Sequence, residues 1–246
     1  MALVKLKRKD NIAQLKLTRP KVLNVLSIDL IKELSRHFKV FSDDPYIRAV
    51  ILTGEGWVPC VVVDLKELVV LPNAADHFEW HGANSLMDIM RACPRPIIGA
   101  INVFAITGIK LALWCGFLIA AKSARFGDTH ARVGIIQSRG LAQLLPRVVG
   151  ISGAKQISLI GEMIGTKTTQ AWGLVNEVTT DQNLLQRAWD LAALIAETDI
   201  TTMGKIKTLV DTSQNTGLDE GLKQEVSVFN RHIKGVLTND IEIRQS

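Results

Sequence analysis

A polar cluster between two apolar segments carries side chains that could do chemistry. Asp128-Thr129-His130-Ala131-Arg132 directly follows Phe126-Gly127 and precedes further hydrophobic residues. Polar groups so close to a core need hydrogen-bond partners or a function. Imidazole titrates near neutral pH, so His130 could act as a base or orient a water molecule, with Asp128 orienting the ring if the segment is a loop. The interpretation we prefer is that His130 and Arg132 form structural hydrogen bonds in a buried turn.

Lys110 is the second candidate for chemistry. It begins a helix predicted over residues 110–114, after a turn-prone segment at 102–108. Lys110 could be a catalytic amine, but we favour a surface lysine at a helix start. Any active site is expected between the Gly108 turn and the His130 cluster. Cys60, Cys93 and Cys115 lack the spacing of metal ligands, so we expect core packing and no metal site.

Composition limits the classes of partner. The chain has 246 residues, of which 47% are hydrophobic and 22% charged, and its net charge is +5. A basic balance suits an anionic ligand, either nucleic acid or a phosphorylated small molecule. The cations are scattered and are not interleaved with aromatic residues, so we do not expect a nucleic-acid partner.

The apolar segments and the two ends of the sequence bear on the cellular compartment of the protein. The longest apolar stretch, residues 109–121, is broken by Lys110 and Gly116 and is too short to span a bilayer. The opening residues MALVKLKRKDN resemble neither a signal peptide nor a transit peptide, and Arg244-Gln245-Ser246 is not a peroxisomal address. We therefore expect a cytoplasmic protein without a membrane partner.

Periodicity predicts an α/β protein. Strands are expected at residues 3–8 and 12–17, which form a hairpin around Asp10-Asn11, and at 49–53, 60–63, 96–101 and 117–121. A helix capped by Ser27 lies between the hairpin and the next strand, Asp64 is expected to cap a short helix, and residues 71–82 form a loop before a helix that ends at Cys93. Helical periods dominate the second half, at 152–160, 168–172, 183–196, 203–211 and 218–233.

Several segments resemble one family in the order in which that family has them. Residues 17–26 read LTRPKVLNVL, and residues 49–56 read AVILTGEG, followed by Cys60 and Asp64-Leu65-Lys66. Residues 96–102 read PIIGAIN, and residues 173–178 read GLVNEV. Together these segments resemble the enoyl-CoA hydratase/isomerase family, the crotonases. The cluster DTHAR resembles a subgroup found among its bacterial and plant members.

This resemblance implies a fold, an assembly and a ligand class. It implies a spiral of ββα units over residues 1–190 and a C-terminal helical trimerisation region over 191–246, in a homotrimer or a hexamer. It implies a lyase of fatty acid metabolism that binds acyl-CoA, with the coenzyme A thioester as substrate and no other cofactor. The backbone N–H groups of Val63 and Gly108 would form an oxyanion hole for the thioester carbonyl. The coenzyme A contacts map to Lys21, Val22, Leu23, Val61, Asp64, Leu65 and Lys66.

The chain departs from the family at its chemical positions. Val61-Val62-Val63 replaces the usual Ala-Gly-Ala. Thr107-Gly108-Ile109 replaces a turn that usually has two or three consecutive glycines, and it is one residue shorter. We therefore expect the two N–H donors to be crowded or misdirected. Lys110 and His130 stand where a hydratase has its two glutamates, and Gln137-Ser138-Arg139-Gly140 replaces the usual turn. Two functions follow: a hydratase whose acid–base groups are His130, Asp128 and Lys110 or water, or a non-catalytic acyl-CoA-binding homologue that lacks both glutamates.

Overall fold

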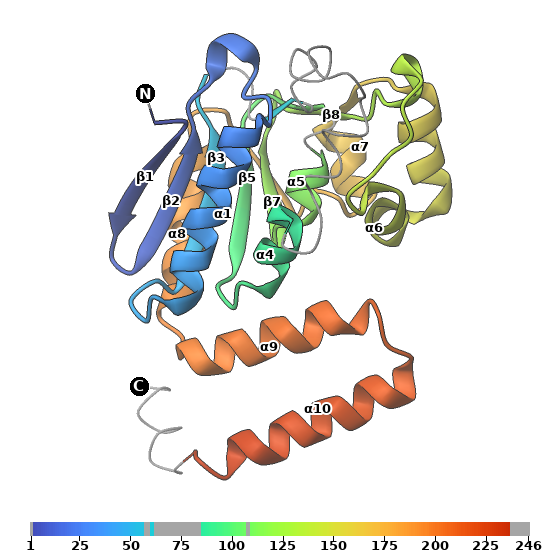
Figure 1. Cartoon of the computed structure of the whole chain (residues 1–246). Coiled ribbons are helices and arrows are strands. Elements are labelled where there is room, and N and C mark those ends of the chain that lie inside the picture. Colours follow the sequence, from blue (N-terminus) through green and yellow to red (C-terminus); the bar gives the residue numbers. More distant parts are fainter. Residues whose placement is uncertain (1, 57–59, 62–84, 107–108, 237–246) are drawn as a thin grey trace.

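The computed structural model describes residues 2–56, 60–61, 85–106 and 109–236 (Figure 1). Its main sheet has six strands in the order β1-β2-β3-β5-β7-β10, and β1 and β2 are antiparallel whereas the remaining neighbours are parallel. The strands are β1 (Val4–Lys9), β2 (Ile12–Leu17), β3 (Ala49–Gly54), β5 (Ile97–Ile101), β7 (Phe117–Ala121) and β10 (Glu177–Thr179). The predicted hairpin is confirmed, and Asp10 and Asn11 form its turn with φ of 48° and 63°.

Helices cover both faces of the main sheet (Figure 1). Residues alternate along β3, so that Val50 and Leu52 pack with α1 (Ile28–Asp43) and α4 (Leu86–Ala92), whereas Ala49 and Ile51 pack with α8 (Leu184–Ala196). The predicted cap of α1 is confirmed, because the Ser27 hydroxyl accepts a hydrogen bond from the Leu30 N–H at 3.3 Å. This strand is therefore buried on both faces, which explains its continuous apolar run.

A second, smaller sheet holds the segment with the chemical candidates. It has the order β4-β6-β8-β9, with β4 (Cys60–Val61), β6 (Phe104–Ile106), β8 (Arg125–Gly127) and β9 (Ile164–Gly165). The prediction of a turn throughout residues 102–108 was wrong, because Phe104–Ile106 pairs in parallel with both β4 and β8. Three residues are too few to show a strand pattern, and only the pairing partners reveal it. The predicted strand at 60–63 is described only for Cys60–Val61, and Asp64 and the predicted loop at 71–82 lie outside the described residues.

The remaining helices form a second core and a C-terminal hairpin. The second core contains residues of α5 (Ile109–Leu113), α6 (Leu141–Lys155) and a π-helical turn at Gln156–Ile160. Gly150 has a non-helical φ of 74° and divides α6 into two helices. The predicted helix at 152–160 is confirmed by the part of α6 after Gly150 and by the π-helical turn, whereas the part that begins at Leu141 was not predicted. The other elements are the 3-10 turns Pro20–Val22 and Ala131–Val133, α7 (Thr166–Ala171), α9 (Ile200–Ser213) and α10 (Leu218–Ile233).

Figure 1 shows α9 and α10 as an antiparallel pair beyond one end of the main sheet. The predicted helices at 203–211 and 218–233 are confirmed as α9 and α10. The division of the chain at residue 190 stays a prediction, and this residue lies within α8. Within the described part of the chain, no helix is long and apolar enough to cross a membrane.

A buried asparagine fixes the turn that carries Lys21, Val22 and Leu23. Asn24 is completely buried with a φ of +50°, and its side-chain oxygen accepts a hydrogen bond from the Arg19 N–H at 2.7 Å. Its amide group donates to the Glu55 carbonyl at 3.2 Å, which ties this turn to the end of β3. The turn thereby holds Val22 and Leu23 at the surface, where they are 38% and 45% exposed.

We predict that Asn24→Ala destabilises the protein by about 1–3 kcal/mol more than Asn11→Ala. Both substitutions place an alanine at positive φ, but only the first removes the hydrogen bonds that Asn24 makes with the partly buried Arg19 N–H and Glu55 carbonyl. Urea unfolding followed by circular dichroism gives both free energies of unfolding. Equal losses would show that the Asn24 side chain does not hold this turn.

Candidate active site

Neighbouring parallel strands bring Lys110 and His130 together. In the second sheet β6 and β8 run in parallel, with Ile106 paired to Gly127 at their carboxyl ends. The chain enters α5 after β6, and Lys110 is the second residue of that helix. Asp128 and His130 follow β8 directly. Both segments therefore leave the same edge of the sheet, and Lys110 Nζ lies 2.8 Å from His130 Nε2.

A chain of hydrogen bonds continues from His130 into the protein. His130 Nδ1 bonds Asp128 Oδ1, which also accepts the His130 backbone N–H at 3.2 Å. Asp128 Oδ2 accepts a hydrogen bond from Gln137 Nε2. A carboxylate only accepts, so His130 Nδ1 carries the proton in that bond and Nε2 is left to accept from Lys110. We call Lys110, His130, Asp128 and Gln137 the relay.

The three ionisable members of the relay are buried, and burial and hydrogen bonds together set their charge states. Lys110 and His130 are 4% and 8% exposed, and Asp128 is fully buried. Burial and the nearby Arg139 guanidinium lower the pKa of Lys110 to about 8, against a smaller opposing effect of the Asp128 carboxylate. Burial opposes ionisation of Asp128, but the hydrogen bonds from His130 and Gln137 outweigh it and hold its pKa below the usual value. Burial also lowers the pKa of Arg139 to about 10.

The structure corrects the interpretation of Lys110 and refines that of His130. The prediction of a surface lysine was wrong, because the start of α5 is packed beneath the segment that follows β8. The structural hydrogen bonds expected of His130 are present, together with the bond to Asp128. Arg132, in contrast, has an exposed side chain, and its Nε donates to the Ile160 carbonyl at 3.2 Å.

Sequence reasoning did not identify Gln137, Ser138 and Arg139 as parts of the site. Ser138 Oγ lies 3.4 Å from Lys110 Nζ, Gln137 holds Asp128, and Arg139 affects the charge of Lys110. The available signal was the replacement of a family turn by three consecutive polar residues before an apolar helix. That pattern is equally typical of an exposed loop, so it did not single out these side chains.

An apolar pocket of about 620 Å³ adjoins the relay. His130 and Gln137 contribute to its wall, and the rest comes from the loop before α6, from α6 itself and from the π-helical turn. The apolar lining residues include Ile135, Ile136, Leu141, Leu145, Ile151 and Leu159. Such a pocket, with a few polar groups at one side, fits the apolar part of a small ligand.

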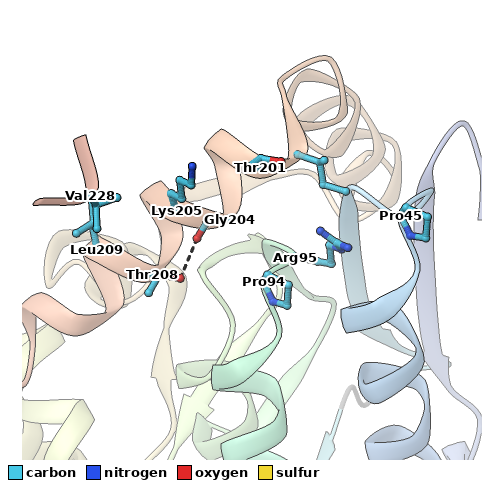
Figure 2. Close-up of a pocket in the computed structure, with 10 residues that line it drawn as sticks. Pro45, Pro94, Arg95, Thr201, Gly204, Lys205, Thr208, Leu209 and Val228 are labelled. Atoms are coloured by element: carbon cyan, nitrogen blue, oxygen red, sulfur yellow. Dashed lines mark hydrogen bonds between the residues drawn. The ribbon is translucent and has the colours of Figure 1, made fainter. Parts of the chain in front are cut away.

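A second pocket lies away from the relay, between α9 and the core. Figure 2 shows Arg95, Pro94 and Pro45 on the core side and Lys205, Thr208 and Leu209 on the helix side. Arg95 donates to the carbonyl oxygens of Phe41, Ser42 and Asp44, so its charge is used to hold the end of α1. None of the predicted site residues that the structure describes lines this pocket of about 430 Å³.

The predicted ligand-binding residues are described only in part. Lys21, Val22 and Leu23 are exposed at the Pro20–Val22 turn, and Val61 lies in β4. Val63, Asp64, Leu65, Lys66 and Gly108 lie outside the described residues, as does Val62. The predicted geometry of the two N–H donors, and their expected crowding, therefore stay predictions.

Cysteine and metal chemistry receive no support from the described part of the chain. There, no three His, Cys, Asp or Glu residues lie close enough together to hold a metal ion. Cys93 is buried in the core of the main sheet, and burial raises the pKa of the Cys115 thiol to about 12. Both thiols therefore pack as small apolar groups.

Comparison with known proteins yields one family. A profile of the enoyl-CoA hydratase/isomerase family matches residues 7–237. A protein of Arabidopsis thaliana named "Probable enoyl-CoA hydratase 1, peroxisomal" is 33% identical over 234 residues, which are 94% of this chain and 86% of that protein. The crotonyl-CoA hydratase of Syntrophomonas wolfei is 29% identical over 228 residues, 91% of this chain and 87% of its own.

Solved structures agree with this comparison. The crystal structure of enoyl-CoA hydratase from Bacillus anthracis superposes with a TM-score of 0.92 at 28% identity, and the match covers 99% of this chain and 95% of that one. Together with the two sheets described above, this likeness confirms the predicted α/β fold of the crotonase type.

We predict that the free energy of unfolding of the wild type rises by about 1–3 kcal/mol relative to that of Lys110→Met as the pH rises from about 8 to about 10.5. The pKa of Lys110 is lowered from 10.5 to about 8 in the folded state, so folding disfavours the ammonium that the unfolded chain carries. That cost is complete below pH 8, where both states are protonated, and it fades as the pH rises from about 8 to about 10.5.

The measurement is urea unfolding of wild type and variant at pH 7, 9 and 10.5. Lys122→Met is the matched control, because Lys122 is exposed and its ammonium stays solvated in the folded protein. A difference between Lys110→Met and wild type that stays constant with pH would contradict the assignment of a disfavoured buried ammonium.

Proposed function

The chain belongs to the enoyl-CoA hydratase/isomerase family, and from this premise we propose that it is a hydratase-type enzyme that binds acyl-CoA thioesters. The observation that carries the proposal is the buried relay. Hydration of an enoyl thioester adds a hydroxyl group to the β carbon and a proton to the α carbon. The reaction needs a group that takes a proton from water and a group that returns one.

The relay can move that proton. His130 is held in one tautomer by Asp128, and its Nε2 shares a hydrogen bond with Lys110. With a pKa of about 8, Lys110 can both lose and regain a proton near neutral pH. The Lys110–His130 pair would thus take the place of the two glutamates that the family resemblance leads one to expect, with Asp128 fixing the ring.

Ligand placement is the second part of the proposal. The N–H groups of Val63 and Gly108 would hold the thioester oxygen, where fixed donors stabilise developing negative charge. Gly108 precedes Lys110 by two residues, which supports a thioester beside the relay. The coenzyme A part would contact Lys21, Val22 and Leu23 together with Val61, Asp64, Leu65 and Lys66. The apolar pocket beside His130 suits the acyl chain.

One observation favours a second candidate function. Both nitrogens of the His130 ring are already engaged, one with Asp128 and the other with Lys110. A relay closed in this way could serve only to stabilise the fold, and the protein would then be an acyl-CoA-binding homologue without hydratase activity. Binding of coenzyme A thioesters is common to both candidates, whereas turnover belongs to the first alone.

We predict that the protein hydrates crotonyl-CoA and that His130→Ala lowers kcat by about 10²–10⁴-fold. The assay follows the loss of absorbance of the conjugated thioester, and calorimetry on the same sample measures binding of coenzyme A. His232→Ala is the matched control, because His232 also contacts a lysine, Lys205, at 3.0 Å but lies on α10.

Two of the outcomes each select one candidate, and a third contradicts both. Turnover that is lost in His130→Ala and kept in His232→Ala supports the hydratase. Binding without turnover in the wild type supports the non-catalytic homologue. A protein that showed neither binding nor turnover would contradict both candidates. It would then be a member of the family without a functional site.

We also propose that the chain assembles into a trimer or a hexamer through its C-terminal region. Five apolar side chains of α10 are at least 42% exposed and recur every three or four residues, so that they share one face of the helix. They are Leu218, Leu222, Val226, Phe229 and Ile233. An apolar stripe of this length on a peripheral helix is typical of a surface that another chain covers.

We predict that Phe229→Glu dissociates the assembly, because it places a charge in the middle of this stripe. Light scattering coupled to gel filtration measures the mass. Ser227→Glu adds the same charge away from the stripe and is expected to leave the mass unchanged. A monomeric wild type, or equal effects of the two variants, would contradict this interface.

A further inference from the structure

We infer that Lys110 is a nucleophile toward acyl-CoA thioesters and that the protein acylates itself at this residue. The inference rests on the acyl-CoA binding proposed above and adds a covalent reaction that differs from hydration. Its chemical class is transfer of an acyl group from a thioester to an amine.

The geometry is that of an activated nucleophile. Covalent catalysts place a nucleophile against a base and hold that base with a third group. Here Lys110 Nζ lies 2.8 Å from His130 Nε2, and His130 Nδ1 bonds Asp128. Gln137 and the His130 backbone N–H fix both oxygens of the carboxylate. The order of groups is amine, imidazole and carboxylate, and each is buried.

A second lysine–histidine contact in the chain lacks this arrangement. Lys205 Nζ lies 3.0 Å from His232 Nδ1, but the other ring nitrogen of His232 faces the Thr202 hydroxyl at 3.2 Å. Lys205 is also half-buried, whereas Lys110 is 4% exposed. Lys205 therefore offers an internal control for what histidine contact alone contributes.

The surroundings of Lys110 favour the neutral amine, which is the reactive form. Among the residues that the structure describes, the charged and titratable groups that face it are His130 and Asp128 after β8 and Arg139 in the loop before α6. Burial and Arg139 together lower the pKa of Lys110 to about 8. At pH 7 the neutral fraction is then roughly 300-fold larger than for a lysine with an ordinary pKa.

The acyl transfer is balanced without any further reactant. The lone pair of Lys110 Nζ attacks the thioester carbonyl carbon, and the bond from carbon to sulfur breaks. His130 Nε2 accepts the proton that Nζ loses, and the proton then passes to the departing coenzyme A thiolate. The products are an amide on Lys110 and free coenzyme A with its thiol.

The product is stable, so each chain reacts once. An amide nitrogen has no basic lone pair, and acylated Lys110 can no longer exchange protons with His130. Self-acylation would therefore switch off any reaction that uses the relay, in proportion to exposure to acyl-CoA. The inference thus describes a modification site that responds to the concentration of its own ligand class.

Butyryl-CoA is the probe that separates this reaction from hydration, because a saturated acyl group has no double bond to hydrate. The full-length protein is incubated with butyryl-CoA, and intact mass and peptide mapping give the rate of butyrylation at Lys110 and at Lys205. We expect Lys110 to react on the order of 100-fold faster than Lys205 at pH 7. Its rate should rise with pH and level off above about 8.

Two variants test the assigned roles. Lys110→Arg keeps the charge but removes the nucleophile, and it should abolish the butyrylated peptide. His130→Gln should slow modification of Lys110 by 10-fold or more and leave Lys205 unchanged. Circular dichroism spectra equal to that of the wild type show that both variants are folded.

The possible results separate self-acylation of Lys110 from the acyl-CoA binding on which it rests. Binding of butyryl-CoA without preferential modification of Lys110 would overturn the inference and leave the proposed acyl-CoA binding intact. Modification of Lys110 that is as fast in His130→Gln as in wild type would overturn the role of the relay. Absence of both binding and modification would overturn the proposed function and the inference together.

Discussion

The parallel pairing of β6 with β8 is the constraint on which the site depends. It places the start of α5 and the segment after β8 at one edge of the second sheet, and so forces Lys110 and His130 within hydrogen-bond distance. The buried side chains of Lys110, His130 and Asp128 and the partly exposed Gln137 then form hydrogen bonds with one another. Without that pairing, a buried lysine and a buried carboxylate would each carry a large desolvation cost.

The position of Lys110 within the relay carries a cost in stability. Burial raises the free energy of the Lys110 ammonium relative to the neutral amine, and the pKa of Lys110 is lowered as a result. A methionine would fill the same space without this cost but would leave His130 Nε2 without its donor. Asp128 supplies negative charge beneath His130, and Arg139 adds positive charge beside Lys110. The two opposed effects leave the amine able to gain or lose a proton near neutral pH.

Much of the fold could be predicted from the sequence, because short stretches of sequence identify many of its turns, helix starts and buried strands. The turn residues Asp10 and Asn11, the Ser27 cap and the apolar run of β3 each identify an element without its neighbours. The contact of Lys110 with His130 could not be predicted in this way. It depends on β6, which has only three residues and is recognisable as a strand only because it pairs with β4 and β8. Gln137 was missed for the same reason, because its role exists only where Asp128 meets it.

The protonation of the His130 ring can be observed directly by 15N NMR of histidine-labelled protein, with the resonances assigned by means of His130→Gln. We predict a proton on Nδ1 and an accepting Nε2. The Nε2 resonance should shift as Lys110 titrates near pH 8, and this response should be lost in Lys110→Met. A proton on Nε2, or a resonance that is indifferent to Lys110, would contradict the relay.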